Sequence, residues 1–224
     1  MANDKELGER VHKHLLALGL ETPMVKMSPD NLEANGGKFD NIQHSHGVIM
    51  QCLGLDMSDD SLKDTPRRIA KMYCQEIFNG LDYENFPKCT TVENKMKYEE
   101  MVCIDNIEVK SMCEHHFLPF VGNATVAYIP NEKVLGLSKF NRVVDFFARR
   151  PQIQERLTEQ ISAALRLILE TEDVAVVIRS SHFCVKLRGV EDSCSDTITS
   201  RVAGRFRTVD SLRAEFLALS RGGK

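Results

Sequence analysis

Two short stretches of the chain carry side chains that could bind a metal ion. Cys113 and His116 are separated by two residues at the end of a strand-like run, and His182 and Cys184 lie in a later apolar run. Thiolates and imidazoles are common zinc ligands in proteins. Alternation along a strand would place His182 and Cys184 on the same face. Together the two stretches predict a metal site.

The ligand types favour a catalytic metal site over a structural one. Structural zinc usually has four protein ligands, whereas catalytic zinc has three and keeps one position for water. Two cysteines and one histidine fit the catalytic type, and their separation along the chain requires a prebuilt fold to bring them together. The spacing does not choose between His115 and His116. It is also compatible with Cys113 and Cys184 as buried apolar residues beside hydrogen-bonded histidines.

The elements that must position these residues follow from hydrophobic periodicity. Apolar residues at helical spacing predict helices, and short β-rich runs predict strands after residue 95. The predicted helices span residues 5–19, 40–53, 65–78, 138–148, 152–169 and 212–219. The predicted strands span residues 101–112, 117–121, 124–129, 174–187 and 197–206. This order predicts an α+β fold with a largely antiparallel sheet and helices packed on one face.

The chain also predicts an organisation into two parts. Residues 1–95 read as an N-terminal helical region and residues 96–224 as the catalytic domain, the two acting as one functional unit. Residues 21–40 are rich in proline, asparagine and glycine, which is typical of a turn-rich connection or a mobile arm. A sheet with free edges favours closure by neighbouring subunits, so we expect an oligomer.

Composition excludes several classes of protein. The formal net charge is −3, which gives no overall attraction to nucleic acid or to an anionic membrane. The first twenty residues lack the apolar core of a secretion signal, and no apolar stretch is long enough to span a bilayer. The seven cysteines then do not read as a disulfide framework. We expect a cytoplasmic protein in which Cys52, Cys74 and Cys103 pack as apolar residues, and we assign no role to Cys89 and Cys194.

At the candidate metal ligands the chain resembles GTP cyclohydrolase I. The matching strings are TPRRIAKMY (65–73), CEHHF (113–117), GLSKFNR (136–142), RPQIQERLT (150–158) and HFCVKLRG (182–189). The resemblance runs from about residue 40 to the C-terminus. It implies the tunnelling fold, in which sheets of several subunits join into a barrel, and a homodecamer with active sites between subunits. The implied reaction converts GTP and water into 7,8-dihydroneopterin triphosphate and formate, the first step of tetrahydrofolate and pterin biosynthesis.

The resemblance also implies roles for individual residues. Cys113, His116 and Cys184 would bind Zn²⁺, which makes water nucleophilic for attack at C8 of the guanine. His115 would protonate N7, and His182 would act as acid or base in opening the ribose. The complete set of implied catalytic residues is His115, His182, Ser138 and Glu114.

Substrate recognition follows from the same blocks. Glu155, with Gln154 beside it, matches the family's position for reading the donors on the guanine edge. Arg68, Lys71, Lys139, Arg142 and Arg188 would hold the triphosphate. Without the resemblance, we would interpret Glu155 as an acid that the helix dipole favours in the first turn. We would interpret each cation as an ordinary solvated side chain.

Two other functions compete with this interpretation. One is another tunnelling-fold enzyme that acts on a pterin or deazapurine, such as the nitrile reductase with its nucleophilic cysteine and nicotinamide cofactor; the Cys/His/Cys set argues against it. The other is a zinc-stabilised nucleic-acid-binding module, which the acidic balance opposes. The chain departs from many family members at Val185 and Lys186, where a methionine commonly follows the second ligand cysteine.

Overall fold

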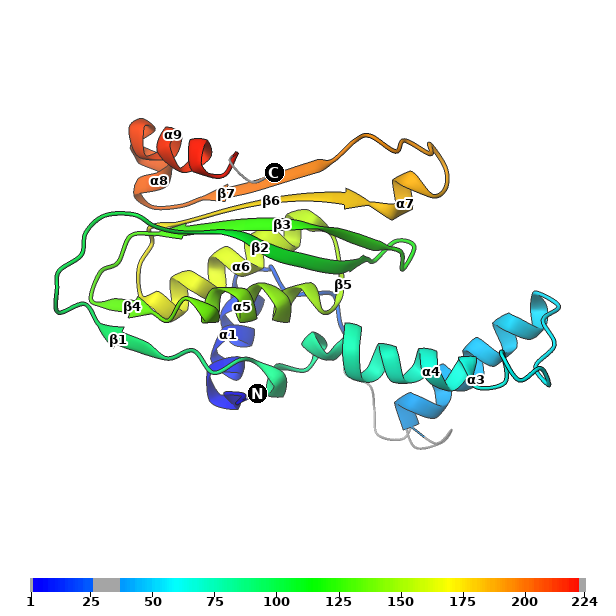
Figure 1. Ribbon diagram of the computed structural model, residues 1–224. Helices are drawn as coiled ribbons and strands as arrows, with labels where there is room; N and C mark the ends of the chain where they lie inside the picture. The colour runs from blue at the N-terminus through cyan, green and yellow to red at the C-terminus, as the bar shows by residue number, and fades with distance from the viewer. Residues whose placement is uncertain (1, 26–36, 222–224) are drawn as a thin grey trace. The chain divides into compact units, whose positions relative to one another are not determined.

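The computed structural model describes residues 2–25 and 37–221, which form two compact units (Figure 1). One unit contains the residues up to Thr22 and those from Gly80 onward, and the other contains Pro23–Asn79. The turn-rich segment predicted at 21–40 falls largely outside the described residues. The functional division at residue 95 stays a prediction. Within the described ranges, no helix combines the length and the apolar character needed to cross a membrane.

A five-stranded sheet forms the centre of the first unit, with the strand order β5-β2-β3-β6-β7 among the described residues (Figure 1). These strands are β2 (Val102–Cys113), β3 (Pro119–Tyr128), β5 (Pro151–Gln152), β6 (Val174–His182) and β7 (Thr197–Val202). Neighbouring strands are antiparallel except β2 and β5, which are parallel. The sheet is therefore mixed. The α+β class is confirmed.

The long strand β3 replaces two predicted strands. The predicted runs 117–121 and 124–129 join through Gly122 and Asn123, which pair with Ser180 and Arg179 of β6. A Cβ atom at Gly122 would lie 1.9 Å from the Arg179 carbonyl oxygen, so the strands need glycine at this close approach. Two short strands that the sequence did not predict, β1 (Thr91–Glu93) and β4 (Lys133–Leu135), form a separate antiparallel pair.

Two long helices cover one face of the sheet, as predicted (Figure 1). They are α5 (Ser138–Ala148) and α6 (Gln154–Leu169). Their apolar stripes, which include Phe140 and Ile161, pack in one core with inward residues of the strands such as Val126 and Val176. Helix α1 (Lys5–Ala17) adds Val11 and Leu15 to this core, which explains its predicted amphipathic pattern.

The C-terminal helices lie on the opposite face of the sheet, which corrects the prediction that helices pack on one face only (Figure 1). Phe206 of α8 (Arg205–Thr208) and Phe216 of α9 (Asp210–Leu219) pack with Ala175 and Val177. Those two residues alternate with Val176, which faces the other core. The strand predicted at 197–206 therefore stops early, at Val202.

The second unit is helical. It contains α3 (Gly37–Cys52) and α4 (Thr65–Lys71), and the chain continues from α4 into a π-helical turn at Met72–Ile77. The single helix predicted at 65–78 thus changes from α-helical to π-helical hydrogen bonding after Lys71. Cys52 is exposed, so the prediction that it packs as an apolar residue was wrong, whereas Cys74 is half-buried. Two short 3₁₀ turns follow along the chain, at Asn79–Leu81, where the second unit ends, and at Tyr83–Asn85 in the first unit.

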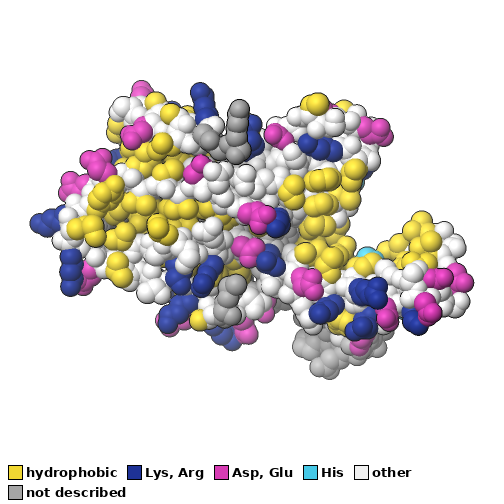
Figure 2. Space-filling model, in the orientation of Figure 1, with side chains coloured by type: hydrophobic (Ala, Val, Ile, Leu, Met, Phe, Trp, Pro, Cys, Tyr) yellow, Lys and Arg dark blue, Asp and Glu magenta, His cyan; other side chains and the backbone are white. Residues whose placement is uncertain are grey.

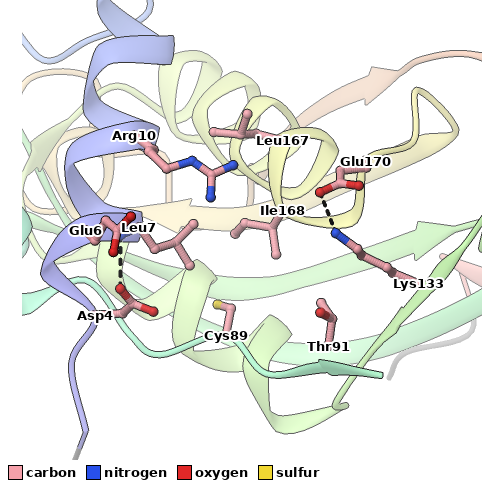
Figure 3. A pocket seen from close by; sticks show the side chains of 10 residues that line it. All are labelled: Asp4, Glu6, Leu7, Arg10, Cys89, Thr91, Lys133, Leu167, Ile168 and Glu170. Atoms are coloured by element: carbon pink, nitrogen blue, oxygen red, sulfur yellow. Dashed lines mark hydrogen bonds and ion pairs between the residues drawn. The ribbon is translucent and has the colours of Figure 1, made fainter. Parts of the chain in front are cut away.

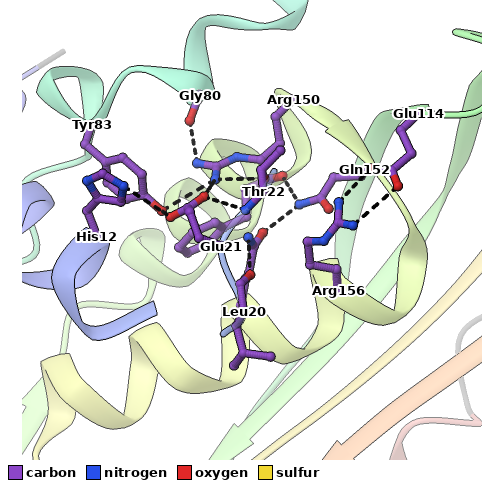
Figure 4. Close-up of polar contacts among 12 residues, drawn as sticks. His12, Leu20, Glu21, Thr22, Gly80, Tyr83, Glu114, Arg150, Gln152 and Arg156 are labelled. Atoms are coloured by element: carbon purple, nitrogen blue, oxygen red, sulfur yellow. Dashed lines mark hydrogen bonds and ion pairs between the residues drawn. The ribbon is translucent and has the colours of Figure 1, made fainter. Parts of the chain in front are cut away.

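Arg150 ties the N-terminal segment to the sheet-containing unit (Figure 4). Its side chain is fully buried, and its guanidinium donates to Glu21 at 3.1 Å and to the Gly80 carbonyl oxygen. The guanidinium also lies 5.0 Å from the centroid of the Phe146 ring. Glu21 in turn accepts a hydrogen bond from the Tyr83 hydroxyl. Burial raises the pKa of Tyr83 well above its usual value, so this hydroxyl stays protonated.

Replacing Arg150 with leucine should destabilise the protein by about 3–5 kcal/mol, because the Glu21 carboxylate would stay buried without its cation. Arg149→Leu is the matched control. Arg149 makes its ion pair with Asp145 at the surface, and such pairs contribute about 0–1 kcal/mol. Denaturant unfolding of both variants measures the difference, and equal stabilities would contradict a structural role for the Arg150 network.

Candidate functional site

The first part of the site is the turn that follows β2. The Cys113 backbone N–H donates to the Leu118 carbonyl oxygen at 2.8 Å, and the Phe117 N–H donates to the Cys113 carbonyl oxygen at 2.9 Å. Phe117 adopts a left-handed conformation, with φ of 52°, that closes the turn. The Glu114 N–H donates to the Gln152 carbonyl oxygen of β5 at 3.0 Å. The loop that carries Cys113 and His116 is therefore fixed by its backbone.

The second part begins where β6 ends. His182 is the last residue of β6, and Cys184 belongs to the short helix α7 (Phe183–Lys186). The prediction that a strand continues to residue 187 was wrong, as was the argument that alternation puts His182 and Cys184 on one face. The pairing of β3 with β6 ends at Phe120 and His182. The residue of β3 beyond this pair is Pro119, which has no N–H to donate, so the ladder cannot continue through it.

The two parts meet because β3 lies between β2 and β6 in the sheet. Cys113, His116 and Cys184 each offer one ligand atom, and these three atoms all lie within 4.8 Å of one another. Cys113 is buried, Cys184 is half-buried and His116 is exposed, so the group opens on one side. The fold thus brings together three residues, far apart in sequence, that could hold a metal ion.

The electrostatics of the group agree with its use as a ligand set. Burial, and next the neighbouring Cys113 thiol, raise the pKa of Cys184, so a metal ion would displace a proton on binding this sulfur. His116 Nε2 lies 2.8 Å from Arg188 Nη1. A guanidinium can only donate, so His116 Nε2 is the acceptor in this contact, and an imidazole lone pair is also what a metal ion binds.

The remaining histidines lie beside the group. His115 Nδ1 is 3.7 Å from Cys113 Sγ, and the His115 side chain is exposed. The His182 ring stacks on Phe120 with 4.6 Å between centroids and 10° between planes. Burial lowers the pKa of His182, and the nearby Glu155 carboxylate partly opposes that shift. His182 Nε2 lies 2.8 Å from Gln154 Oε1.

The structure uses Gln154 and Glu155 differently. Gln154 is buried, and its side-chain amide contacts β6, β7 and His182, so it presents no free amide to a substrate. Glu155 is exposed in the first turn of α6. Of the two residues predicted to read the guanine, only Glu155 has a side chain available in this geometry.

Glu114 makes a bidentate ion pair with Arg156 (Figure 4). The two N–O distances are 2.6 and 3.3 Å, and both side chains are largely buried. This pair ties the metal-ligand turn to α6. Arg156 was not predicted as a functional residue, although it stands within the matched string RPQIQERLT. The contact favours a positioning role for Glu114 over the predicted catalytic one.

Replacing Glu114 with glutamine should therefore lower kcat by less than about tenfold, whereas loss of a general acid or base costs about 10²–10⁴-fold. The measurement is steady-state kinetics of Glu114→Gln, Arg156→Gln and the double variant. If the pair acts as a unit, the double variant loses no more than the worse single variant. A loss above 10²-fold in Glu114→Gln alone would restore the catalytic role.

Three predicted residues lie away from the metal-ligand group within the chain. Ser138, Lys139 and Arg142 belong to the start of α5, which follows β4, whereas the end of α5 leads into β5 beside Cys113 (Figure 1). Helix α5 has 11 residues, so its ends are about 16 Å apart. Among the described residues, none of these three belongs to the group formed by Cys113, His116 and Cys184.

Arg68 and Lys71 belong to α4 in the helical unit, and both are exposed. Arg68 makes a 3.9 Å ion pair with Asp64, one turn earlier. Their spacing puts both cations on one side of α4, as the sequence predicts.

A separate open cavity of about 250 Å³ lies against α1 and contains none of the candidate site residues (Figure 3). Two of the charged residues in its wall, Lys133 and Glu170, pair with each other, and Asp4 accepts from the Leu7 N–H at the start of α1. Cys89 also lines the cavity, and burial raises the pKa of its thiol to about 11. This thiol is therefore protonated at neutral pH and a poor nucleophile.

Comparison with known proteins gives concordant matches. The model of a family described as GTP cyclohydrolase I matches residues 42–221. A protein of Yersinia enterocolitica named GTP cyclohydrolase 1 is 55% identical over 217 residues, which cover 97% of each chain. A protein of the same name from Shewanella sp. (strain W3-18-1) is 52% identical over 212 residues, covering 95% of this chain and 97% of the relative. These matches confirm the resemblance seen in the sequence motifs.

Proposed function

Because the chain belongs to the GTP cyclohydrolase I family, we propose that it converts GTP and water into 7,8-dihydroneopterin triphosphate and formate. This is the first step of tetrahydrofolate and pterin biosynthesis. The observation that carries the proposal is the meeting of Cys113, His116 and Cys184 within 4.8 Å, with His115 and His182 beside them. Metal ligands and proton donors are the parts that hydrolytic ring opening needs.

The metal ion that fits the three ligands best is Zn²⁺. Two thiolates and one imidazole are soft to borderline donors that select zinc over magnesium or calcium, and a set of three leaves a position open. When bound, zinc would supply a Lewis acid that makes water nucleophilic near neutral pH. The backbone hydrogen bonds of the 113–118 turn hold two of the ligands before any ion arrives.

Proton transfer falls to the two histidines beside the group. His115 is exposed and lies against Cys113, so it can reach a substrate bound there and protonate N7 of the guanine. His182 is held by Phe120 and Gln154, and it acts as the acid or base that opens the ribose. Ser138 assists the ribose rearrangement.

Charged side chains bind the rest of GTP. The Glu155 carboxylate accepts hydrogen bonds from the N–H groups on the guanine edge. Its exposed position near His182 supports this role. Arg188 lies next to His116, where it can contact a phosphate oxygen. The other cations proposed for the triphosphate are Lys139, Arg142, Arg68 and Lys71.

The proposed site requires more than one subunit. Lys139 and Arg142 lie in the first half of α5, whereas the other end of this helix leads toward Cys113, and this favours their supply by a neighbouring chain. Apolar side chains gather around α7 and the β2–β3 turn, which suits packing against another copy (Figure 2). The exposed apolar residues there are Phe117, Val121, Val185, Leu187 and Val190. We propose a homo-oligomer with sites between subunits, specifically the homodecamer of the tunnelling fold with its cross-subunit barrel.

The remaining proposals concern location and partners. The protein acts in the cytoplasm, and neither nucleic acid nor a membrane is a partner. Its formal net charge of −3 gives no overall attraction to nucleic acid or to an anionic membrane, which supports this proposal. A zinc-stabilised binding module and a nicotinamide-dependent nitrile reductase are the competing functions.

An assay of purified, zinc-loaded protein with GTP tests this proposal. Formate and an oxidisable, fluorescent pterin should appear in equal amounts. A well-folded, zinc-containing oligomer that releases neither product would point to another reaction. Adding NADPH and a deazapurine nitrile in a parallel sample tests the reductase alternative directly.

A further inference from the structure

The side-chain amide of Gln154 has a fixed orientation. Gln154 is the first residue of α6, and only 1% of it is exposed. Its Nε2 lies 3.0 Å from the Ile178 carbonyl oxygen and 3.1 Å from the Thr197 carbonyl oxygen. A carbonyl oxygen can only accept a hydrogen bond, so the NH₂ end must face β6 and β7. The amide oxygen, Oε1, must then face His182.

A second set of hydrogen bonds supports this orientation. The Thr158 hydroxyl donates to the backbone oxygen of Gln154 at 2.8 Å, and it lies 2.7 Å from the Thr199 hydroxyl. Thr158 has one proton and uses it on Gln154, so Thr199 donates to Thr158. Thr199 Oγ1 can therefore accept from Gln154 Nε2, 3.1 Å away, and the two hydrogens of this NH₂ group are shared among the hydroxyl and the two carbonyl oxygens. The donor and the acceptor are thus determined for each hydrogen bond in this network.

The direction of the network determines where His182 carries its proton. Gln154 Oε1 can only accept, and it lies 2.8 Å from His182 Nε2, so Nε2 carries a hydrogen. A neutral imidazole with a proton on Nε2 keeps its lone pair on Nδ1. Stacking on Phe120, with 10° between the ring planes, restrains the plane of the ring. Both the tautomer and the orientation of His182 are thus set by neighbouring side chains.

We propose that Gln154 is a positioning residue that holds His182 in the tautomer protonated on Nε2, so that Nδ1 is the atom that accepts a proton during the reaction. Thr199 and Thr158 act through Gln154 by fixing its amide. The inference rests on the proposed role of His182 as an acid or base. It assigns Gln154 to a histidine instead of to the guanine edge.

The first test is the kinetics of the Gln154→Met variant. Methionine has a similar shape but neither donates nor accepts the hydrogen bonds, so the tautomer is no longer fixed. We expect kcat to fall by about 10²-fold with KM within about threefold of the wild type. A guanine-binding role predicts the reverse, a raised KM with kcat unchanged, and that result would overturn the proposal.

Variants of Thr199 keep the proposal testable if Gln154→Met folds poorly. Thr199→Val removes the hydroxyl at constant shape and should lower kcat by about tenfold, whereas Thr199→Ser should recover most of that loss. Thr91→Val, in the two-stranded sheet, controls for the same chemical change at a strand position outside the network. Equal activity of Thr199→Val and Thr199→Ser would contradict the role of Thr199.

A spectroscopic measurement reads the tautomer without any reaction. Protein with ¹⁵N-labelled histidine rings is studied by solid-state NMR at about pH 8, where an ordinary imidazole is neutral. The His182 signals, identified by their loss in His182→Asn, should show a protonated Nε2 and an unprotonated Nδ1. In the Thr199→Val and Gln154→Met variants, His182 should populate both tautomers, protonated on Nε2 and protonated on Nδ1. A wild-type ring protonated on Nδ1 would overturn the inference, whereas failure to open GTP would count against the proposed function alone.

Discussion

Replacing Cys184 with alanine is expected to abolish the release of formate from GTP and most of the metal binding. Cys184 supplies one of the three ligand atoms that lie within 4.8 Å of one another. Loss of an outer hydrogen-bond partner alone costs a metal site about 10–100-fold in affinity or activity, and loss of a direct ligand costs more. We therefore expect kcat/KM to fall by more than about 10²-fold. Formate release and metal content per chain are the two measurements.

Cys194→Ala is the matched control for this experiment. Cys194 is exposed in the segment between α7 and β7, and the three-residue ligand group does not include it. Its replacement should leave zinc content and formate release unchanged. Thermal unfolding and oligomer size of both variants separate a lost site from a lost fold. A folded Cys184→Ala protein with wild-type activity would remove Cys184 from the site.

Two inactive variants should restore activity when they share one oligomer. Cys184→Ala damages the candidate metal-ligand group, and a Lys139→Ala/Arg142→Ala variant removes two cations from the first half of α5. Removing both cations should cost about 30-fold or more in kcat/KM, since truncating a paired charge costs about 2–5 kcal/mol. Suppose that each site takes its metal-ligand residues from one chain and its α5 cations from another. Random co-assembly of the two variants then produces an intact copy of both groups in about a quarter of the sites. Co-expression with different affinity tags isolates these mixed oligomers.

A pair of variants damaged on the same side provides the control for complementation. Cys184→Ala mixed with His115→Ala should recover no activity, because His115 and Cys113 lie together in the group that also needs Cys184. Recovery of a quarter of the wild-type activity in the first mixture alone would support sites shared between chains. No recovery in a correctly assembled mixture would mean that one chain forms a complete site.

Much of the fold follows from the sequence because its elements have strong periodic patterns. Helices α5 and α6 begin and end within about two residues of the predicted positions, since their apolar stripes face a single core. Strand β3 was predicted as two strands, 117–121 and 124–129, separated by Gly122 and Asn123. The close approach of β6 at Gly122 is a tertiary requirement that the local pattern does not reveal.

The site was only partly accessible from the sequence. The candidate ligands Cys113, His116 and Cys184 come together as a group that could hold a metal ion. The reason given for Cys184 was wrong, because α7 and not a strand carries it. The partners of the predicted residues were missed. Arg156 beside Glu114 and Thr199 beside Gln154 depend on how α6 lies against the sheet, and the spacing of residues along the chain does not encode such contacts.

A zinc titration of metal-free protein tests the central claim most directly. Formate release from GTP is measured at each zinc level, together with bound zinc per chain and oligomer size. We predict that activity rises in proportion to bound zinc and reaches its maximum at one ion per chain, because the described residues offer one group of three close ligands. Full activity of the metal-free protein, or one tightly bound zinc per chain without formate release, would contradict the account.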